Sequence, residues 1–223
     1  MSVIAEDVLI VDDEKAFRES VGPAFEQYGF AVEAVDPGEV KALVDRGSRP
    51  GTAIVDLYMP GIDGIAVAEI LTRGDPDVVL FFLTAQLETQ QFRARAKKLG
   101  LRVAAWLEKP LPDSDREANS FFRTLHERIL DQRFANLTDR WRREVGFMSS
   151  TSQMSMNPSY QRIIGLGPTV VPLIIRELRK EPEHWFWALK AITGQDPVDE
   201  SARGDVDSMR TAWVTWAENK GIA

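Results

Sequence analysis

Residues 53–64, with the sequence AIVDLYMPGIDG, are the most informative segment for the fold class. It opens with a short apolar run that ends in Asp56, and a turn rich in Gly and Pro follows. Residues 64–73 then place apolar side chains on one side of a helix, with Asp63 in position to cap its first turn. A buried strand, a turn and an amphipathic helix form one unit of an α/β protein, with an acidic residue at the strand end.

Four further apolar runs of strand length accompany this one, at residues 8–11, 31–35, 78–83 and 103–107. The segments 14–28, 64–73 and 86–99 have helical patterns, and Gly100 is a stop signal for the last of them. Short continuous apolar runs with helices between them are typical of buried parallel strands. We therefore predict an α/β domain over residues 1–132, with a flavodoxin-like five-stranded parallel sheet in the order 2-1-3-4-5.

A long helix is predicted from Asp113 to Val145, because apolar residues recur there at steps of three and four. Its first half should cover the sheet as a fifth helix. For its second half two interpretations stand: a helical connector that packs on a C-terminal domain, or a dimerising helix pair. Residues 147–157 are rich in Ser, Thr and Met and indicate a linker, so 133–157 is interpreted as connector and linker.

A small all-α domain is predicted for residues 158–223, with helices at 158–164, from Pro168, at 184–193 and at 206–219. The stretches 167–174 and 188–194 are similar to one HEAT-type helical hairpin. One hairpin cannot form a solenoid, since such units need neighbours to bury their faces. We therefore expect a compact interaction module with a small aromatic core drawn from Trp185, Phe186, Trp187, Trp213 and Trp216.

Composition excludes several classes of protein. The 223 residues contain no Cys and two His, which rules out disulfides, thiolate metal sites and multi-histidine zinc sites. No apolar run approaches the length that crosses a bilayer, and the N-terminus lacks a secretory signal, so a cytoplasmic protein is expected. Residues 1–133 hold 16 basic and 23 acidic side chains and residues 134–223 hold 11 of each, which disfavours DNA binding.

Polar side chains gather at the predicted strand ends. Asp12 and Asp13 follow the first strand, Asp56 ends the third, Thr84 follows the fourth and Lys109 follows the fifth. The carboxyl ends of parallel strands share one edge of a sheet, and clustered carboxylates repel one another unless a cation neutralises them. Oxygen ligands of this kind suit Mg²⁺, while the lysine and the threonine suit an anion. The set therefore indicates phosphoryl transfer to a carboxylate.

Four motifs in this order resemble the receiver domain of two-component response regulators: VDDE at 11–14, DLYMPGIDG at 56–64, LTA at 83–85 and LEKP at 107–110. The resemblance covers about residues 6–132. It implies that Asp56 is the phosphoacceptor, and that Asp13, Asp56 and the backbone carbonyl of Tyr58 bind Mg²⁺, with Asp12 acting through a metal-bound water. It also implies that Thr84 and Lys109 hold the phosphoryl oxygens. The peptide that corresponds to Lys109–Pro110 is often cis in this family, so a cis bond is expected here.

Thr84 and the aromatic residue three before the lysine form the switch of this family, and here that residue is Trp106. Tyr or Phe is more usual at this place, so Trp106 is either a switch residue or a static side chain packed against the 86–99 helix.

The resemblance implies a response regulator that takes a phosphoryl group from a sensor histidine kinase or phosphotransfer protein, and that is itself a phosphoacceptor and not an enzyme. The output expected of residues 158–223 is binding of an unknown protein target, with a homodimer as a further expectation. The alternatives are a DNA-binding transcriptional regulator and an enzyme with an unfamiliar effector domain.

Overall fold

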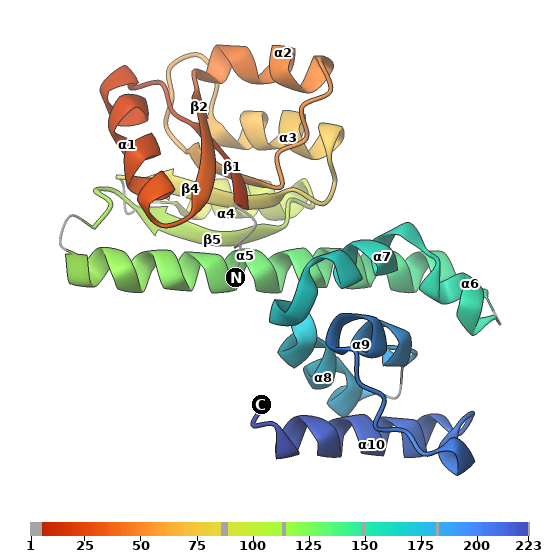
Figure 1. Cartoon of the computed structure of the whole chain (residues 1–223). Coiled ribbons are helices and arrows are strands. Elements are labelled where there is room, and N and C mark those ends of the chain that lie inside the picture. The colour runs from red at the N-terminus through yellow and green to blue at the C-terminus, as the bar shows by residue number, and fades with distance from the viewer. Residues whose placement is uncertain (1–5, 86–88, 113–114, 149, 182, 223) are drawn as a thin grey trace. The chain divides into compact units, whose positions relative to one another are not determined.

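The computed structural model describes residues 6–85, 89–112, 115–148, 150–181 and 183–222. The chain divides into two compact units, residues 1–133 and 134–223 (Figure 1). Within the described residues, no helix combines the length and the apolar character that crossing a bilayer requires.

The first unit alternates strands and helices along the chain. Its strands are β1 (Glu6–Val11), β2 (Phe30–Val35), β3 (Thr52–Asp56), β4 (Val79–Thr84) and β5 (Val103–Glu108). Its helices are α1 (Lys15–Gln27), the 3-10 turn η1 (Pro37–Glu39), α2 (Val40–Asp45), α3 (Gly64–Gly74), α4 (Gln90–Lys98) and the first part of α5 (Asp115–Val145). All strand pairs are parallel and the order is β2-β1-β3-β4-β5, which confirms the predicted sheet.

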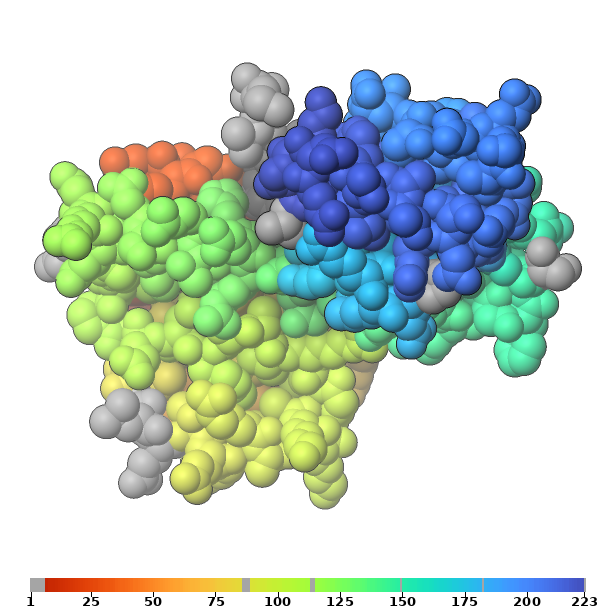
Figure 2. Space-filling model, turned by 90° about the horizontal axis from the view of Figure 1, so that it is seen from below, coloured from red at the N-terminus to blue at the C-terminus, as the bar shows by residue number. Residues whose placement is uncertain are grey.

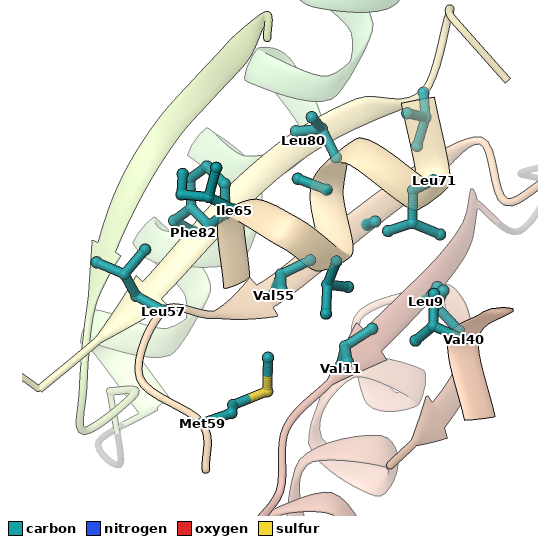
Figure 3. Close-up of a cluster of buried hydrophobic side chains, with 14 of the residues drawn as sticks. Leu9, Val11, Val40, Val55, Leu57, Met59, Ile65, Leu71, Leu80 and Phe82 are labelled. Carbon is teal, nitrogen blue, oxygen red and sulfur yellow. The ribbon is translucent and has the colours of Figure 1, made fainter. Parts of the chain in front are cut away.

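Alternate side chains of the central strands point to opposite faces of the sheet, and each face carries its own helices. On one face, α2, α3 and α4 cover Leu9, Val55 and Phe82 together with their neighbours. Figure 3 shows the side chains of this cluster converging between the strands and α3, with Ile65 beside Phe82. On the other face, α1 and α5 cover the intervening strand residues.

Two parts of the first unit differ from the sequence prediction. Helix α2 and the turn before it were not predicted, because Val40–Asp45 is shorter than two turns and carries too few residues to show a period. Strand β5 is only partly buried, although its apolar run predicted a buried strand. The predicted helix starts at Gln86 and Asp113 lie outside the described residues, while Gly100 takes the positive φ of +69° that its stop signal requires.

The second unit is helical. After the end of α5 come α6 (Thr151–Ser155), α7 (Pro158–Gly165), η2 (Gly167–Val170), α8 (Val171–Lys180), α9 (Phe186–Thr193), η3 (Glu200–Ala202) and α10 (Val206–Asn219). Helix α10 packs on α8 and α9 and lies at the surface of this unit, where it is the deep-blue segment in Figure 2. The linker predicted at 147–157 is wrong in part: Ser150 caps α6 and Asn157 caps α7 through their side chains.

Aromatic rings form the core of the second unit. The indole of Trp141 lies 4.6 Å from that of Trp185, and Tyr160 stacks on Trp185 at 5.5 Å. The Tyr160 hydroxyl donates to the carbonyl of His184 and accepts from the amide of Ala188, so this buried polar group is satisfied. The predicted aromatic core is therefore confirmed for Trp185 and Trp213, which are buried, but Trp187 is 55% exposed and lies outside it.

Candidate functional site

The sheet brings the predicted polar residues to one edge. Asp12 follows the last residue of β1, while Asp56 and Thr84 are the last residues of β3 and β4. Lys109 follows β5, and its backbone amide donates to the Thr84 carbonyl at 2.9 Å. Because the strands pair in parallel, the motifs at their carboxyl ends come together in one cluster.

Three carboxylates face a shared point at this edge. One oxygen from each of Asp12, Asp13 and Asp56 lies within 4.8 Å of the other two. The side chain of Asp12 is 1% exposed and that of Asp56 is 10% exposed, while Asp13 is open to solvent. Two sheltered carboxylates and one that is open to water form a donor set that fits a hard divalent cation, because such ions take carboxylate oxygens and keep several waters.

Lys109 completes the electrostatics of the cluster. Its Nζ donates to Asp12 Oδ2 at 2.6 Å and to Asp56 Oδ2 at 2.7 Å. Burial acts to lower the pKa of Lys109, but the hydrogen bonds to the two carboxylates outweigh it and the pKa is raised. Burial raises the pKa of Asp12, against the opposing effects of Lys109 and of the Glu14 amide. The ammonium thus stays charged and offsets part of the repulsion among the acids.

Backbone amides aim the remaining carboxylate oxygens. The amide of Glu14 donates to Asp12 Oδ1 at 2.9 Å, and the amide of Tyr58 donates to Asp56 Oδ1 at 3.3 Å. Arg18 donates to the backbone carbonyl of Asp12 at 2.7 Å, which ties the first turn of α1 to the end of β1. The two amide bonds orient the side chains of Asp12 and Asp56, the two sheltered acids of the cluster.

Gly64 lets the backbone close around Asp56. A Cβ atom at this position would lie 2.3 Å from the carbonyl oxygen of Asp56 and 3.0 Å from Leu57 Cα. Neither neighbour is the end of a flexible side chain, so a larger residue would have to displace the strand end. Asp63, the residue before it, caps α3 by accepting from the Ala66 amide at 2.9 Å, as predicted, and also pairs with Arg95 of α4.

The predicted switch residues lie at neighbouring strand ends. Thr84 is buried, and Trp106 packs against Phe82 with ring centroids 4.8 Å apart. The guanidinium of Arg93 lies 4.5 Å from the centre of the Trp106 ring, and its Nε donates to Thr89 Oγ1 at 3.0 Å. Trp106 thus lies between the sheet and α4. The Lys109–Pro110 peptide is cis.

Sequence reasoning did not assign a site role to Phe17, Arg93 or Gly64. Phe17 counted only as one of the apolar positions of the helix predicted at 14–28, yet its ring lies under the Lys109 ammonium at 4.5 Å. Gly64 was visible inside a motif, but only the fold shows what it approaches. A contact between segments far apart in the sequence leaves no periodic signal, which is why Arg93 was not found.

Chemically, the edge can hold a divalent cation and a tetrahedral anion side by side. Asp12, Asp13 and Asp56 supply oxygen ligands, and Lys109 supplies a positive charge directed at Asp56. A carboxylate so placed can act as a nucleophile toward phosphorus, and the surrounding charge can stabilise the transferring group.

Comparison with known proteins agrees with this geometry. The family model described as "Response regulator receiver domain" matches residues 8–117. Response regulator MprA of Mycolicibacterium vanbaalenii is 32% identical over 79 residues, which cover 35% of this chain and 34% of that protein. DNA-binding response regulator MtrA of Mycolicibacterium smegmatis is 30% identical over 89 residues, which cover 40% and 39%. The chain thus matches little more than a third of the length of these relatives.

Among solved structures, a receiver domain protein (CheY-like) from Methanospirillum hungatei JF-1 is similar at 22% identity, with 57% of this chain and 96% of that chain covered and a TM-score of 0.48. The strand order and the matched family model concern the same part of the molecule. Residues 8–117 of this chain therefore belong to the response regulator receiver domain family.

Proposed function

We propose that this chain is a two-component response regulator in which Asp56 accepts a phosphoryl group from a sensor histidine kinase or a phosphotransfer protein. One observation carries the proposal: the Asp56 carboxylate is grouped with those of Asp12 and Asp13, and Lys109 Nζ reaches both Asp12 and Asp56 within 2.7 Å. A structural ion pair alone would not need the third carboxylate, which adds repulsion in the absence of a cation.

In the proposed reaction an Asp56 carboxylate oxygen attacks phosphorus, the bond from phosphorus to the donor atom breaks, and the donor leaves with that electron pair. An acyl phosphate forms on Asp56. Lys109, released from the carboxylates, pairs with a phosphoryl oxygen, and the Thr84 hydroxyl donates to another. Asp13, Asp56 and the Tyr58 carbonyl would hold Mg²⁺, with Asp12 acting through a water, and the bound ion would supply charge neutralisation.

Removal of the proposed nucleophile tests this assignment. Asp56→Asn keeps the size of the side chain but supplies an amide, so it should abolish acid-stable, base-labile labelling by acetyl phosphate in the presence of Mg²⁺. Asp45→Asn, an exposed aspartate on α2, is the matched control and should label like the unchanged chain. Mobility shifts on Phos-tag gels or mass spectra of the intact protein report the label. Undiminished labelling of the Asp56 variant would refute the proposal.

The proposal extends to signal readout through Thr84 and Trp106. Phosphorylation would draw the Thr84 hydroxyl toward the phosphoryl oxygens and allow the indole to reorient against Phe82. The contact of Arg93 with the Trp106 ring opposes that movement, because a cation–π contact favours the present ring position. The positions of Thr84 and Trp106 at neighbouring strand ends therefore support a switch. The packing of the indole determines how much free energy its reorientation requires.

For the output we propose protein binding by a helical domain at 158–223, joined to a receiver at 1–132 through the segment 133–157. Exposed apolar side chains support this output, because Trp187 of this domain is 55% exposed and Met156, in the adjoining segment, is 72% exposed. Aromatic and methionine side chains are enriched at protein interfaces. The equal number of acidic and basic residues in 134–223 gives no basic surface by composition.

A DNA-binding output is the second candidate, because a curated relative bears the words DNA-binding response regulator in its name. That match extends over 89 residues and leaves most of both proteins outside the comparison. Retention of the chain on DNA at low salt, lost steeply as salt rises, would favour this candidate, since phosphate contacts release counterions. Absence of retention at low salt removes it.

A further inference from the structure

The ring of Phe17 lies against the Lys109 ammonium, which pairs with two acids of the carboxylate cluster. Lys109 Nζ is 4.5 Å from the ring centroid, within the range of a cation–π contact. Phe17 and Lys109 also line the same hollow of about 470 Å³, together with Glu14 and Leu111. Phe17 is half-buried and packs against the α1–α5 core. This packing limits the movement of the ring.

Within the described residues, the Lys109 ammonium thus has three contacts of two kinds. Two are charged hydrogen bonds, to Asp12 at 2.6 Å and to Asp56 at 2.7 Å. Both acceptors belong to the carboxylate set to which the proposed function assigns a cation and a phosphoryl group. Either ligand competes for the same oxygens, so both hydrogen bonds are weakened when the site is in use.

The third contact has no such competitor. A phenyl ring carries no net charge, binds no hard cation and accepts no phosphoryl group. Its quadrupole attracts an ammonium whether or not the carboxylates are occupied. The Lys109 side chain is 17% exposed, so the contact is partly desolvated and is weakened little by water.

We propose that Phe17 is a positioning residue for phosphoryl transfer, which holds the Lys109 ammonium at the anion site while Asp12 and Asp56 exchange partners. This inference rests on the proposed function of Asp56 and Lys109 and deepens it. A flexible four-carbon side chain would otherwise lose its anchors at the step where its charge is needed. Pre-ordering of that charge raises the rate of transfer, because stabilisation fixed in advance costs no reorganisation.

The test changes the π face of the side chain at position 17 and alters the volume of that side chain little. Phe17→Leu removes the π face and keeps an apolar side chain, whereas Phe17→Tyr keeps the face. Incorporation of mono-, di- and trifluorophenylalanine at position 17 of the full chain weakens the quadrupole in steps at nearly constant shape. Initial rates of Asp56 labelling are measured against acetyl phosphate concentration with saturating Mg²⁺, to separate the maximal rate from the half-saturating concentration.

A matched control comes from Phe121→Leu. Phe121 is also half-buried, and its ring contact is with Phe122 at 5.2 Å, on the face of the first unit that α5 covers. Any general cost of replacing a half-buried Phe by Leu appears in this variant as well. Thermal unfolding of each variant shows whether the fold is kept.

We expect Phe17→Leu to lower the maximal labelling rate about two- to tenfold, which corresponds to the usual strength of a cation–π contact. Phe17→Tyr should restore it, and the fluorinated series should fall in order of fluorine number. A change in half-saturating concentration alone, or equal rates across the fluorinated series, would overturn the proposal in favour of a packing role.

Failure of the proposed function is distinguishable from failure of this inference. If Asp56 is not the phosphoacceptor, Asp56→Asn labels normally and the site of labelling lies elsewhere. If Phe17 is only a packing residue, labelling remains on Asp56 and its maximal rate follows the Phe121→Leu control.

Discussion

At the scale of single residues, the site depends on Gly64, which has no side chain, as well as on the residues that carry functional groups. Gly64 begins α3 with its α-carbon against the backbone of Asp56 and Leu57. A main chain packed this closely leaves the strand end no freedom to move away from Asp12 and Lys109. The position of the Asp56 carboxylate is thus set partly by a residue with no functional group.

Gly64→Ala should therefore disturb the site and the fold together. The added methyl group meets backbone atoms, so we expect a loss of about 1–3 kcal/mol in the free energy of unfolding, as for overpacked cores, and slower Asp56 labelling. Urea denaturation followed by circular dichroism measures the first quantity. Gly165→Ala is the control: it lies in α7 with nothing beyond its own helix and chain neighbours within 4 Å of the new methyl group, and it should keep its stability or gain up to about 1 kcal/mol. A Gly64 variant as stable as the unchanged chain would contradict this account.

The residues that could be predicted from the sequence are those whose position follows from strand ends. Asp12, Asp56, Thr84 and Lys109 each end or follow a strand, and parallel strands bring such residues together without further information. Phe17 could not be placed by that logic, because its contact depends on how far α1 is rotated against β5. Rotation of a helix about its axis is set by packing, which no local pattern records.

At the scale of elements, ion pairs between helices organise the second unit around Arg142. This residue of α5 donates to Glu183 at 2.8 and 2.6 Å and to Glu177 of α8 at 2.7 Å. Burial acts to raise the pKa of Glu177, but the hydrogen bonds from Lys180 and Arg142 outweigh it and the pKa is lowered. A carboxylate with a lowered pKa stabilises the folded state only while it is ionised.

Arg142→Gln should lower the free energy of unfolding of the second unit by about 1–3 kcal/mol at pH 7, since charged hydrogen bonds of a sheltered carboxylate are lost. The deficit should be full above a pH of about 4.5 and should shrink as the pH falls through the lowered pKa of Glu177, because protonation then removes from the unchanged protein the pair that the variant already lacks. Chemical denaturation at a series of pH values measures it. Arg179→Gln, whose 3.3 Å pair with Glu218 is exposed, should cost less than about 1 kcal/mol. A pH-independent deficit would count against the pair.

Elements were predictable in proportion to their length and period. Helix α10 begins and ends where the sequence predicted, because Asp205 caps it and its aromatic residues repeat at helical spacing. Helix α6 has five residues and lies among Ser, Thr and Met, which also favour loops, so a linker was wrongly predicted there. Short helices of this kind exist because of their caps and neighbours, here the Ser150 side chain and the contact with α7.

At the scale of the whole molecule, α5 supplies core residues to both units. Leu125 and Ile129 are buried in the first unit, and Phe134 and Trp141 are buried in the second. The apolar stripe that had suggested a dimerising helix pair is thus covered by the chain itself, which removes the basis for that interpretation. A homodimer through another surface stays a prediction.

Ile129→Ala tests this use of the stripe. A side chain buried within one chain should cost about 2–5 kcal/mol when truncated, through lost apolar burial and a cavity. The midpoint of thermal unfolding should fall and should not depend on protein concentration over about a hundredfold range. If the stripe mediated a dimer, the midpoint of the unchanged chain would rise with concentration, because association stabilises the folded state by mass action.

The placement of Trp106 has a practical consequence for spectroscopy. It is the sole tryptophan of residues 1–133, since Trp141, Trp185, Trp187, Trp213 and Trp216 all lie further along the chain. The Arg93 guanidinium, 4.5 Å from the centre of its ring, and the Phe82 ring, 4.8 Å away, make its emission wavelength sensitive to small displacements. A difference spectrum against Trp106→Phe would isolate that emission. The protein therefore carries its own optical reporter of events at the carboxyl end of β5, with no added dye.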